Sequence, residues 1–263
     1  PLGEVAQLGN EQVALAQRLI SLRGKTEVLD NTFLKFLMQS PDVQDQLRAR
    51  ATGTTVLGIK QSELRKLMLR LPPIHEQRAI ASTLGTLDDK IDLTRRMNET
   101  LEAMARALFK SWFVDFDPVR TRATGRACSL PDWLVNLFPA RFVYSEAGEV
   151  PEGWKVGSLR DVCALNPEVW SKQTRPSTIN YVDLSNTKWG RIDSIAEYRH
   201  QDAPSRAQRV LRPGDTIVGT VRPGNGSYAY ISEEGLTGST GFAVLRPTRA
   251  DYAPFVYLAA TAH

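Results

Sequence analysis

The sequence predicts an α+β fold in which a long coiled-coil-type helix is flanked by mixed α/β segments. Two observations lead to this prediction. Apolar residues recur every seven positions between Gln77 and Trp112 without an interrupting proline, as is typical of a helix that packs along another helix. Glycine, proline and β-branched residues dominate 151–263, which is typical of short strands joined by turns. The 263 residues are 42% hydrophobic and 24% charged, the composition of a globular protein.

The region before the long helix is predicted to contain short helices and a short strand. Apolar residues have helical spacing in 28–40, where Asp30 or Asn31 is the expected N-cap and a proline follows. Residues 51–59 are interpreted as a Gly- and Thr-rich loop that leads into a short strand. Residues 62–73 are expected to form a helical turn and an extended exit, because a residue that precedes proline avoids the α region.

The long helix is predicted to begin at Pro73, since a proline in the first helical turn gives up no hydrogen bond. Glu76 then places negative charge near the positive end of the helix dipole. At about 1.5 Å per residue, some 40 residues give a rod about 60 Å long. Its narrow apolar stripe requires cover from another helix, in the same chain or in a partner. The alternative is a core helix of one globular domain.

Two rows of the seven-residue repeat define the expected seam between helices. Gln77 opens the first row, and Asn98 is interpreted as a polar residue that sets the register. The residues assigned to the seam are Ile80, Leu84, Leu87, Ile91, Asn98, Leu101 and Leu108.

An internal similarity relates segments on the two sides of the helix. Residues 21–37 and 244–258 share a strand-like run that ends in Leu-Arg, a turn, an acidic residue and an aromatic-led helix. We therefore interpret the chain as the rear part of one domain, the helix, and the front part of a second domain of the same kind. The predicted boundaries are 1–72 for the first domain, 73–125 for the spacer helix, 126–150 for a connection and 151–263 for the second domain.

Charge, cysteine content and hydropathy limit the class of protein. The formal net charge of +4 permits contact with a polyanion without requiring it. Cys128 and Cys163 fit no metal-binding spacing and are interpreted as reduced structural thiols. No apolar run reaches the roughly 18 residues that a membrane span needs, and no signal peptide opens the chain. A cytoplasmic protein is expected.

The sequence shows no recognisable catalytic site. It contains neither a Gly-rich phosphate loop followed by Lys-Ser/Thr nor a G-x-G-x-x-G after a strand. DFDPVR at 115–120 lacks the second proline and the aromatic residue of an adenine methyltransferase motif. The segments 131–134 and 167–172 lack the spaced second acid and the lysine of a nuclease metal site. We expect no catalytic residue, no metal and no cofactor.

Four motifs occur in an order that is more specific than any one of them. A Gly/Thr loop precedes a Pro-Pro, Glu-Gln, Ile pattern at the helix start, a Pro-x-Gly-Trp segment opens the β-rich region, and a Pro-Gly-Asp strand entry lies within it. Their residues are 51–55; Pro72, Pro73, Glu76, Gln77 and Ile80; Pro151, Gly153 and Trp154; and 211–219. In this order the motifs resemble, over essentially the whole chain, the specificity subunit of type I restriction–modification systems.

This resemblance implies two target recognition domains that each read one half of a split DNA sequence. Conserved helices would separate the domains and dock the methyltransferase subunits. Modification and cleavage, with S-adenosylmethionine, Mg²⁺ and ATP, would belong to the methyltransferase and restriction subunits, so a non-catalytic specificity subunit is expected. Parts of the family pattern are missing at both ends, and a partial chain is expected. The alternatives are a stand-alone restriction endonuclease and a coiled-coil scaffold without DNA binding.

Basic side chains that recur through 172–222 are the candidates for contact with double-stranded DNA. As a set they are expected to position phosphates. For each one alone, the alternative is a solvated face balanced by acidic residues. The candidates are Lys172, Arg175, Lys188, Arg191, Arg206 and Arg209, with Arg199 and Arg212 in the same run.

The Gly-Asn-Gly loop is the predicted base-reading segment. Arginine forks onto guanine and asparagine onto adenine in a major groove, and a structural hairpin turn is the alternative. The candidates in and beside this loop are Arg222, Asn225, Ser227 and Tyr228. In the first domain, Thr52, Thr54 and Thr55 are candidates for contact with the DNA backbone.

Overall fold

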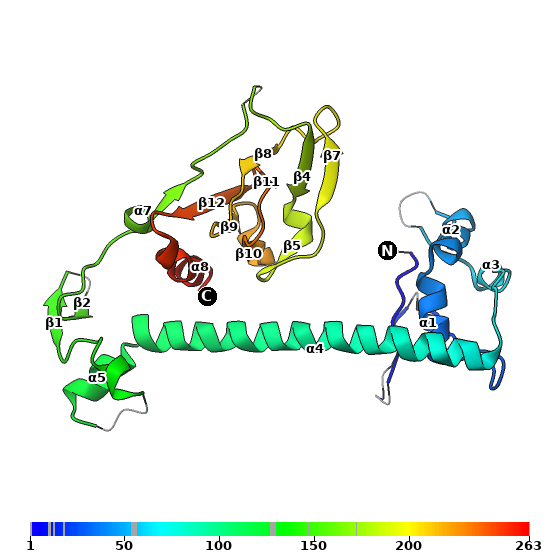
Figure 1. The fold of residues 1–263 in the computed structure, drawn as a ribbon, viewed down its shortest axis with the longest axis horizontal. Helices are drawn as coiled ribbons and strands as arrows, with labels where there is room; N and C mark the ends of the chain where they lie inside the picture. Colours follow the sequence, from blue (N-terminus) through cyan, green and yellow to red (C-terminus); the bar gives the residue numbers. More distant parts are fainter. Residues whose placement is uncertain are drawn as a thin grey trace. The chain divides into compact units, whose positions relative to one another are not determined.

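The computed structural model describes residues 2–9, 12, 14–17, 19–53, 57–126, 130–146, 148–171 and 173–262. The chain forms two compact units, Pro1–Thr100 and Leu101–His263, and the long helix α4 (Ile74–Phe113) contributes residues to both. Short helices precede α4 in the first unit, whereas the second unit combines strands with helices (Figure 1). The predicted α+β class is confirmed.

Three short helices precede α4 in the first unit: α1 (Asn31–Gln39), α2 (Pro41–Ala49) and α3 (Gln61–Leu64). Asp30 caps α1, because its side chain accepts hydrogen bonds from the backbone N–H groups of Thr32 and Phe33, both at 2.9 Å. The helix predicted within 28–40 is confirmed, with Asp30 and not Asn31 as its cap. The buried core of this unit consists of Leu34, Met38, Val43 and Leu47.

The segment 51–59 differs from the predicted loop and strand. In the described part of this segment, the backbone forms an isolated bridge, in which Thr52 N–H donates to the carbonyl of Gly58 at 2.8 Å and Gly58 N–H donates back at 2.9 Å. The strand expected near the start of 21–37 is also absent, since residues 21–30, all of them described, contain no strand. A strand before the related helix occurs in 244–258 alone, where β12 (Phe242–Pro247) precedes α8 (Ala253–Thr261).

Helix α4 is one continuous element of 40 residues, as the repeat predicted. It begins at Ile74, and Pro73 lies immediately before it rather than in its first turn. The carbonyl of Pro73 accepts the first two helical hydrogen bonds, from Glu76 N–H at 3.0 Å and Gln77 N–H at 3.1 Å. Glu76 lies in the first turn, where its charge complements the helix dipole.

The end of α4 agrees with the end of the seven-residue repeat at Trp112, and the 73–125 segment assigned to the spacer extends beyond it. The helix stops at Phe113, and Phe116 adopts the left-handed conformation with φ of 56°. A separate helix, α5 (Asp117–Ala123), then begins with Pro118 in its first turn. The segment assigned to one helix, 73–125, therefore contains two helices and a turn.

Two four-stranded sheets build the second unit (Figure 1). One sheet has the antiparallel order β10-β9-β12-β3, and the other has the order β7-β4-β11-β8 with a parallel β4–β11 pair. Their bounds are β3 (Cys163–Leu165), β4 (Thr178–Val182), β7 (Ala196–Arg199), β8 (Ala207–Val210), β9 (Thr216–Gly219), β10 (Tyr228–Tyr230) and β11 (Leu236–Ser239). Both sheets contribute to one buried cluster, in which Val182 and Leu236 meet Ile217, Phe242 and Val244. The mainly β character predicted for 151–263 is confirmed.

Smaller elements complete the second unit. They are α6 (Asp132–Val135), the hairpin β1 (Phe142–Ser145) and β2 (Gly148–Pro151), α7 (Leu159–Val162), the hairpin β5 (Thr187–Lys188) and β6 (Arg191–Ile192), and the 3₁₀ turns η1 (Leu184–Asn186), η2 (Pro223–Asn225) and η3 (Ala250–Tyr252). Cys163 is a buried free thiol, and Cys128 lies outside the described residues. None of the described helices is both long and apolar enough to cross a bilayer.

The Pro-x-Gly-Trp segment packs against the end of α4 within the second unit. The ring of Trp154 lies 5.6 Å from that of Phe113 and 5.8 Å from that of Phe116, measured between centroids. Phe113 also meets Phe255 of α8 at 5.4 Å. Gly153 turns the chain with φ of 78°, a conformation that favours glycine. The motif therefore attaches the start of the β region to the last turn of the helix.

Candidate nucleic-acid interface

The connection between β9 and β10, residues 220–227, forms what we call the reading loop. At its start, the N–H and Oγ1 of Thr220 both donate to the carbonyl of Gly241, at 2.9 and 3.0 Å. At its end, Ser227 Oγ donates to the carbonyl of Leu184 at 3.3 Å. Both ends of the loop are thus fastened to neighbouring turns of the same unit.

Arg222 occupies the tip of the reading loop in a strained conformation. Its φ of 51° lies in the left-handed region, which is uncommon for a residue with a side chain. Asn225 N–H closes the turn by donating to the carbonyl of Arg222 at 2.9 Å. Both side chains are exposed, and no described residue forms an ion pair with the Arg222 guanidinium. Arg222 and Asn225 therefore have the exposure that base reading requires.

Trp189 packs against the reading loop at Gly226. Its backbone N–H donates to the carbonyl of Gly226 at 2.7 Å. Gly226 has φ of 64°, and a Cβ at this position would lie 2.6 Å from the Trp189 ring. Glycine is required here both by the backbone conformation and by the close approach of the ring.

Two of the four predicted base-reading residues are buried. Ser227 and Tyr228 are each 7% exposed, and Ser227 uses its hydroxyl on the carbonyl of Leu184. The hydroxyl of Tyr228 accepts a hydrogen bond from Arg106 Nη2 at 3.1 Å. Because their side chains lie inside the protein, Ser227 and Tyr228 lack the exposure of Arg222 and Asn225, and base contact by these two residues stays a prediction.

Arg206 and Arg191 form ion pairs on the surface of the second unit. Arg206 Nη2 donates to Asp183 Oδ2 at 2.7 Å, and Arg191 Nε donates to Asp193 Oδ1 at 2.8 Å. Arg206 Nε also donates to the hydroxyl of Tyr181, and this hydrogen bond and the charge of Asp183 raise the pKa of Arg206. The Arg191–Asp193 pair is exposed on both sides and therefore weak, so a phosphate can compete for the Arg191 guanidinium. The Arg206 side chain is 58% exposed, whereas its partner Asp183 is 19% exposed.

Arg175 and Arg209 are half-buried, unlike the solvated side chains that phosphate contact requires. Arg175 Nη2 donates to the backbone carbonyl of Ala207 at 3.2 Å. The Nε atoms of both arginines are buried and have no hydrogen-bond partner among the described residues. Arg175 thus serves first to hold the start of β8, which the sequence did not indicate.

Of the remaining candidates for contact with phosphates or the DNA backbone, some are exposed and others lie outside the described residues. Lys188 on β5 and Arg199 on β7 are exposed and form no ion pair with the described residues. Thr52 is exposed beside its isolated bridge in the first unit. Lys172, Thr54 and Thr55 lie outside the described residues.

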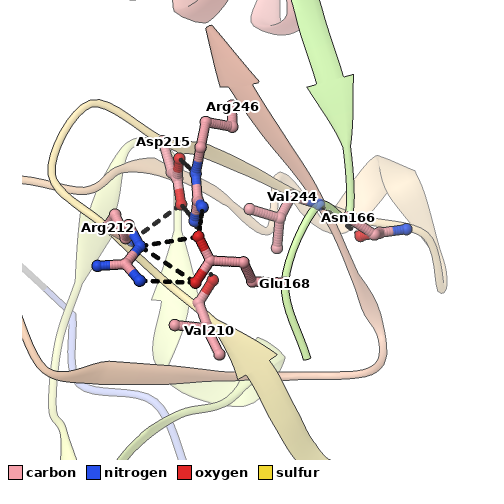
Figure 2. A network of polar contacts seen from close by, with 7 residues as sticks. All are labelled: Asn166, Glu168, Val210, Arg212, Asp215, Val244 and Arg246. Carbon is pink, nitrogen blue, oxygen red and sulfur yellow. Dashed lines mark hydrogen bonds and ion pairs between the residues drawn. The ribbon is translucent and has the colours of Figure 1, made fainter. Parts of the chain in front are cut away.

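Arg212 belongs to a network of polar contacts whose more buried members are Asp215 and Arg246, although its own side chain is 59% exposed (Figure 2). Its Nη2 donates to Glu168 Oε2 at 2.7 Å, and its backbone N–H donates to Asp215 Oδ2 at 2.9 Å. Arg246 joins the two acids: its Nε and Nη2 donate to Asp215, both at 2.8 Å, and its Nη1 donates to Glu168. Hydrogen bonds from Arg212, aided by Arg246, hold the pKa of Glu168 below its ordinary value of 4.5. The Pro-Gly-Asp strand entry is therefore a structural brace.

The residues assigned to the seam of α4 are mostly uncovered in this chain. The exposed fractions are 41% for Ile80, 55% for Leu87, 48% for Ile91, 58% for Leu101 and 45% for Leu108. Leu84 is half-buried and Asn98 is exposed. Cover of this stripe by another helix stays a prediction.

Gln77 is an exception to its row in the repeat. It is 1% exposed, and its Nε2 donates to the carbonyls of Val28 and Pro72 at 3.0 and 2.8 Å. Its Oε1 accepts from Asp30 N–H at 3.0 Å. Gln77 therefore fastens α4 to the body of the first unit and does not face a partner helix.

A polar cluster that the sequence did not predict joins α4 to α8 in the second unit. Glu102 Oε1 accepts from Arg106 Nη2 and from the hydroxyl of Tyr257, both at 2.7 Å. Burial, followed by the hydrogen bond to Glu102, raises the pKa of Tyr257 far above its usual value. The spacing of Glu102 and Arg106, four residues apart on a helix, was the available signal. Nothing in the sequence connects this pair to Tyr257.

The exposed candidate side chains are suited to binding a ligand through hydrogen bonds. Arginine, lysine and asparagine side chains at the surface donate hydrogen bonds to phosphate oxygens and base edges. In the part of the chain that the structure describes, no group of three or more His, Cys, Asp and Glu residues is placed to hold a metal ion.

Comparison with known proteins relates the chain to one family. Residues 1–103 match the family model described as the type I restriction modification DNA specificity domain. The chain is 29% identical over 164 residues to the type I restriction enzyme MjaIX specificity subunit of Methanocaldococcus jannaschii, covering 62% of this chain and 33% of that protein. It is 28% identical over 197 residues to the type I restriction enzyme HindI specificity subunit of Haemophilus influenzae, covering 58% of this chain and 43% of that protein.

A solved structure is also similar. The HsdS subunit from Thermoanaerobacter tengcongensis shows 36% identity and a TM-score of 0.36, over 41% of this chain and 28% of that chain. The chain spans between a third and a half of the length of the two curated relatives. The resemblance drawn from the motifs is confirmed: the chain is similar to the specificity subunits of type I restriction enzymes.

Proposed function

We propose that this chain supplies DNA-sequence specificity to a type I restriction–modification complex and is not itself an enzyme. The observation that carries the proposal is the match of residues 1–103 to the DNA specificity domain of such systems. The names of the curated relatives, which describe specificity subunits, support it. Modification and cleavage belong in this proposal to methyltransferase and restriction subunits that join the same complex.

The target is bipartite in this proposal. Residues 151–263 belong to one target recognition domain and residues 1–72 to another, and α4 is the spacer. A helix of 40 residues is about 60 Å long at about 1.5 Å per residue. One turn of duplex measures about 34 Å, so the helix is long enough to separate two half-sites on one face of the DNA.

The reading loop is the proposed base-reading element of the second domain. Arg222 and Asn225 are exposed at its tip, and its two ends are fastened by Thr220 and Ser227. A rigid loop gives specificity because little side-chain and backbone freedom is lost on binding. Lys188, Arg191 and Arg206 are the proposed phosphate contacts.

The exposed stripe of α4 supports docking of other chains. Leu87, Ile91 and Leu101 are each about half exposed, which is unfavourable for apolar side chains in water. In the proposed complex a second helix covers the stripe, and the methyltransferase subunits dock on the helical pair. The restriction subunits are then held through the complex.

A selection from duplexes with a random core tests the proposal. The purified chain, alone and with methyltransferase subunits, is incubated with the pool at low salt, and the bound duplexes are sequenced. We expect a sequence preference in which Arg222→Ala loses about 1–3 kcal/mol of discrimination at one base position. The matched control is Arg249→Ala, because Arg249 is also exposed and pairs with Asp251 outside the reading loop.

Two results would contradict the proposal. Failure to retain any duplex at low salt, with and without methyltransferase subunits, would favour a coiled-coil scaffold. Mg²⁺-dependent cleavage of DNA by the purified chain alone would favour a stand-alone endonuclease.

A further inference from the structure

One arginine of α4 contacts the base of the reading loop. Arg106 lies on the part of the helix that belongs to the second unit. Its Nη2 donates to the hydroxyl of Tyr228 at 3.1 Å, and its guanidinium lies 5.4 Å from the centre of the Tyr228 ring. Tyr228 follows the last residue of the reading loop directly.

The guanidinium of Arg106 is held on several sides. Its Nη1 donates to the carbonyl of Thr261 at 2.7 Å, and its Nη2 donates to Glu102 at 2.7 Å. The hydroxyl of Tyr257 donates to the same carboxylate oxygen of Glu102. Acceptors on α4, α8 and β10 thus fix the direction of one planar group, which lysine with its single ammonium cannot reproduce.

A short chain of contacts leads from Arg106 to the tip of the loop. The ring of Tyr228 meets that of Trp189 edge-on at 6.1 Å. Trp189 in turn donates its backbone N–H to Gly226 and packs its ring against that glycine. Arg222 is held in its left-handed conformation on this supported loop.

We infer that Arg106 is a positioning residue for DNA reading: it fixes Tyr228, and through Tyr228 and Trp189 the reading loop, against the long helix. This inference rests on the proposed function. Arg106 does not touch DNA in this arrangement, because its donors are used inside the protein. Its loss changes which bases Arg222 and Asn225 can reach without removing a phosphate contact.

Hydrogen–deuterium exchange on the full chain tests the mechanical part of the inference. The variant is Arg106→Lys, which keeps the charge and loses the planar fork. The matched control is Arg96→Lys, because Arg96 is exposed on the same helix. We expect peptides that contain Trp189 and Asn225 to exchange at least about tenfold faster in Arg106→Lys, with unchanged exchange at Ile217 in the core. Unchanged exchange at Trp189 and Asn225 would overturn the inference.

Selection from the random duplex pool tests whether the loss of the Arg106 contacts changes the DNA sequence selectivity of the chain. We expect Arg106→Lys to lower the ratio of preferred to non-specific binding on the order of tenfold, while binding to the unselected pool stays within about twofold. Arg96→Lys should retain both. A selective wild-type chain whose Arg106→Lys variant is equally selective would overturn the inference. A wild-type chain without any preference would reject the proposed function instead, and with it the role of Arg106 in reading, whatever the exchange shows.

A second variant guards against a failure to fold. Tyr228→Phe removes only the hydroxyl that accepts from Arg106 and keeps the ring beside Trp189. If Arg106→Lys exposes the core at Ile217, Tyr228→Phe decides the question. Faster exchange of the loop with relaxed selectivity supports the inference, and wild-type behaviour in both measurements overturns it.

Discussion

Removal of the Asp215 carboxylate is expected to destabilise the second unit strongly. Asp215 is 1% exposed and accepts three hydrogen bonds, two from Arg246 and one from the backbone N–H of Arg212. Breaking a buried ion pair by removal of one partner costs about 3–5 kcal/mol. Arg246 keeps Glu168 as a second partner and is 19% exposed, which places the expected loss for Asp215→Ala near the lower end, at about 3 kcal/mol.

Urea denaturation followed by tryptophan fluorescence measures this loss. All five tryptophans lie in the second unit, so the signal reports on that unit. The matched control is Asp251→Ala, because Asp251 pairs with Arg249 at the surface with side-chain exposures of 59% and 63%. The control should lose less than about 1 kcal/mol. A loss below about 1 kcal/mol for Asp215→Ala, or equal losses in the two variants, would refute the view that the network braces the fold.

Two further predictions concern pH and the reading loop. The pKa of Glu168 is lowered from 4.5 in the folded protein, so its stabilising effect is present above pH 4.5 and disappears as the pH falls through the lowered pKa. The urea midpoints of wild type and Glu168→Gln should therefore converge as the pH is lowered from 7 to 3, and a constant difference would contradict this. Gly226→Ala places a Cβ 2.6 Å from the Trp189 ring at a φ of 64° and should cost about 1–2 kcal/mol. Gly224→Ala, with nothing within 4 Å of its Cβ, is the control, and equal urea midpoints for the two variants would argue against a tightly supported loop.

The elements that depend on local pattern were predictable from the sequence. The repeat from Gln77 to Trp112 predicted α4, because apolar residues seven positions apart fall on one face of a helix and the pattern needs no contact with distant residues. The end of α4 at Phe113 lies one residue beyond Trp112, where the repeat stops, although no proline or glycine marks it. The chain leaves the helix there because Phe116 turns into the left-handed region while its ring packs on Trp154, and this contact is made by residues distant in sequence.

The candidate site was predictable only in part, for the same reason. The position of Arg222 and Asn225 in a loop between strands was predictable because a Pro-Gly-Asn-Gly segment favours a turn. The burial of Tyr228 was not predictable, because it involves contact with Arg106, which lies 122 residues earlier in the chain. The ion pair of Arg212 was not predictable, because its acidic partner, Glu168, lies 44 residues away. An arginine in a sequence does not reveal whether its partner is a phosphate or a carboxylate of the same protein.

Gln77 has a consequence for anyone who would redesign the long helix. A designer who regularised the repeat would write leucine at this position, because the row calls for an apolar residue. That change would remove the side-chain hydrogen bonds to the carbonyls of Val28 and Pro72 and to the amide of Asp30, and these backbone groups would lose their partner. The contact between the start of α4 and the rest of the first unit would then be weakened, whether or not a partner helix is bound. A polar residue that interrupts the apolar repeat is therefore the residue that attaches the long helix to the backbone preceding α1 and to Pro72.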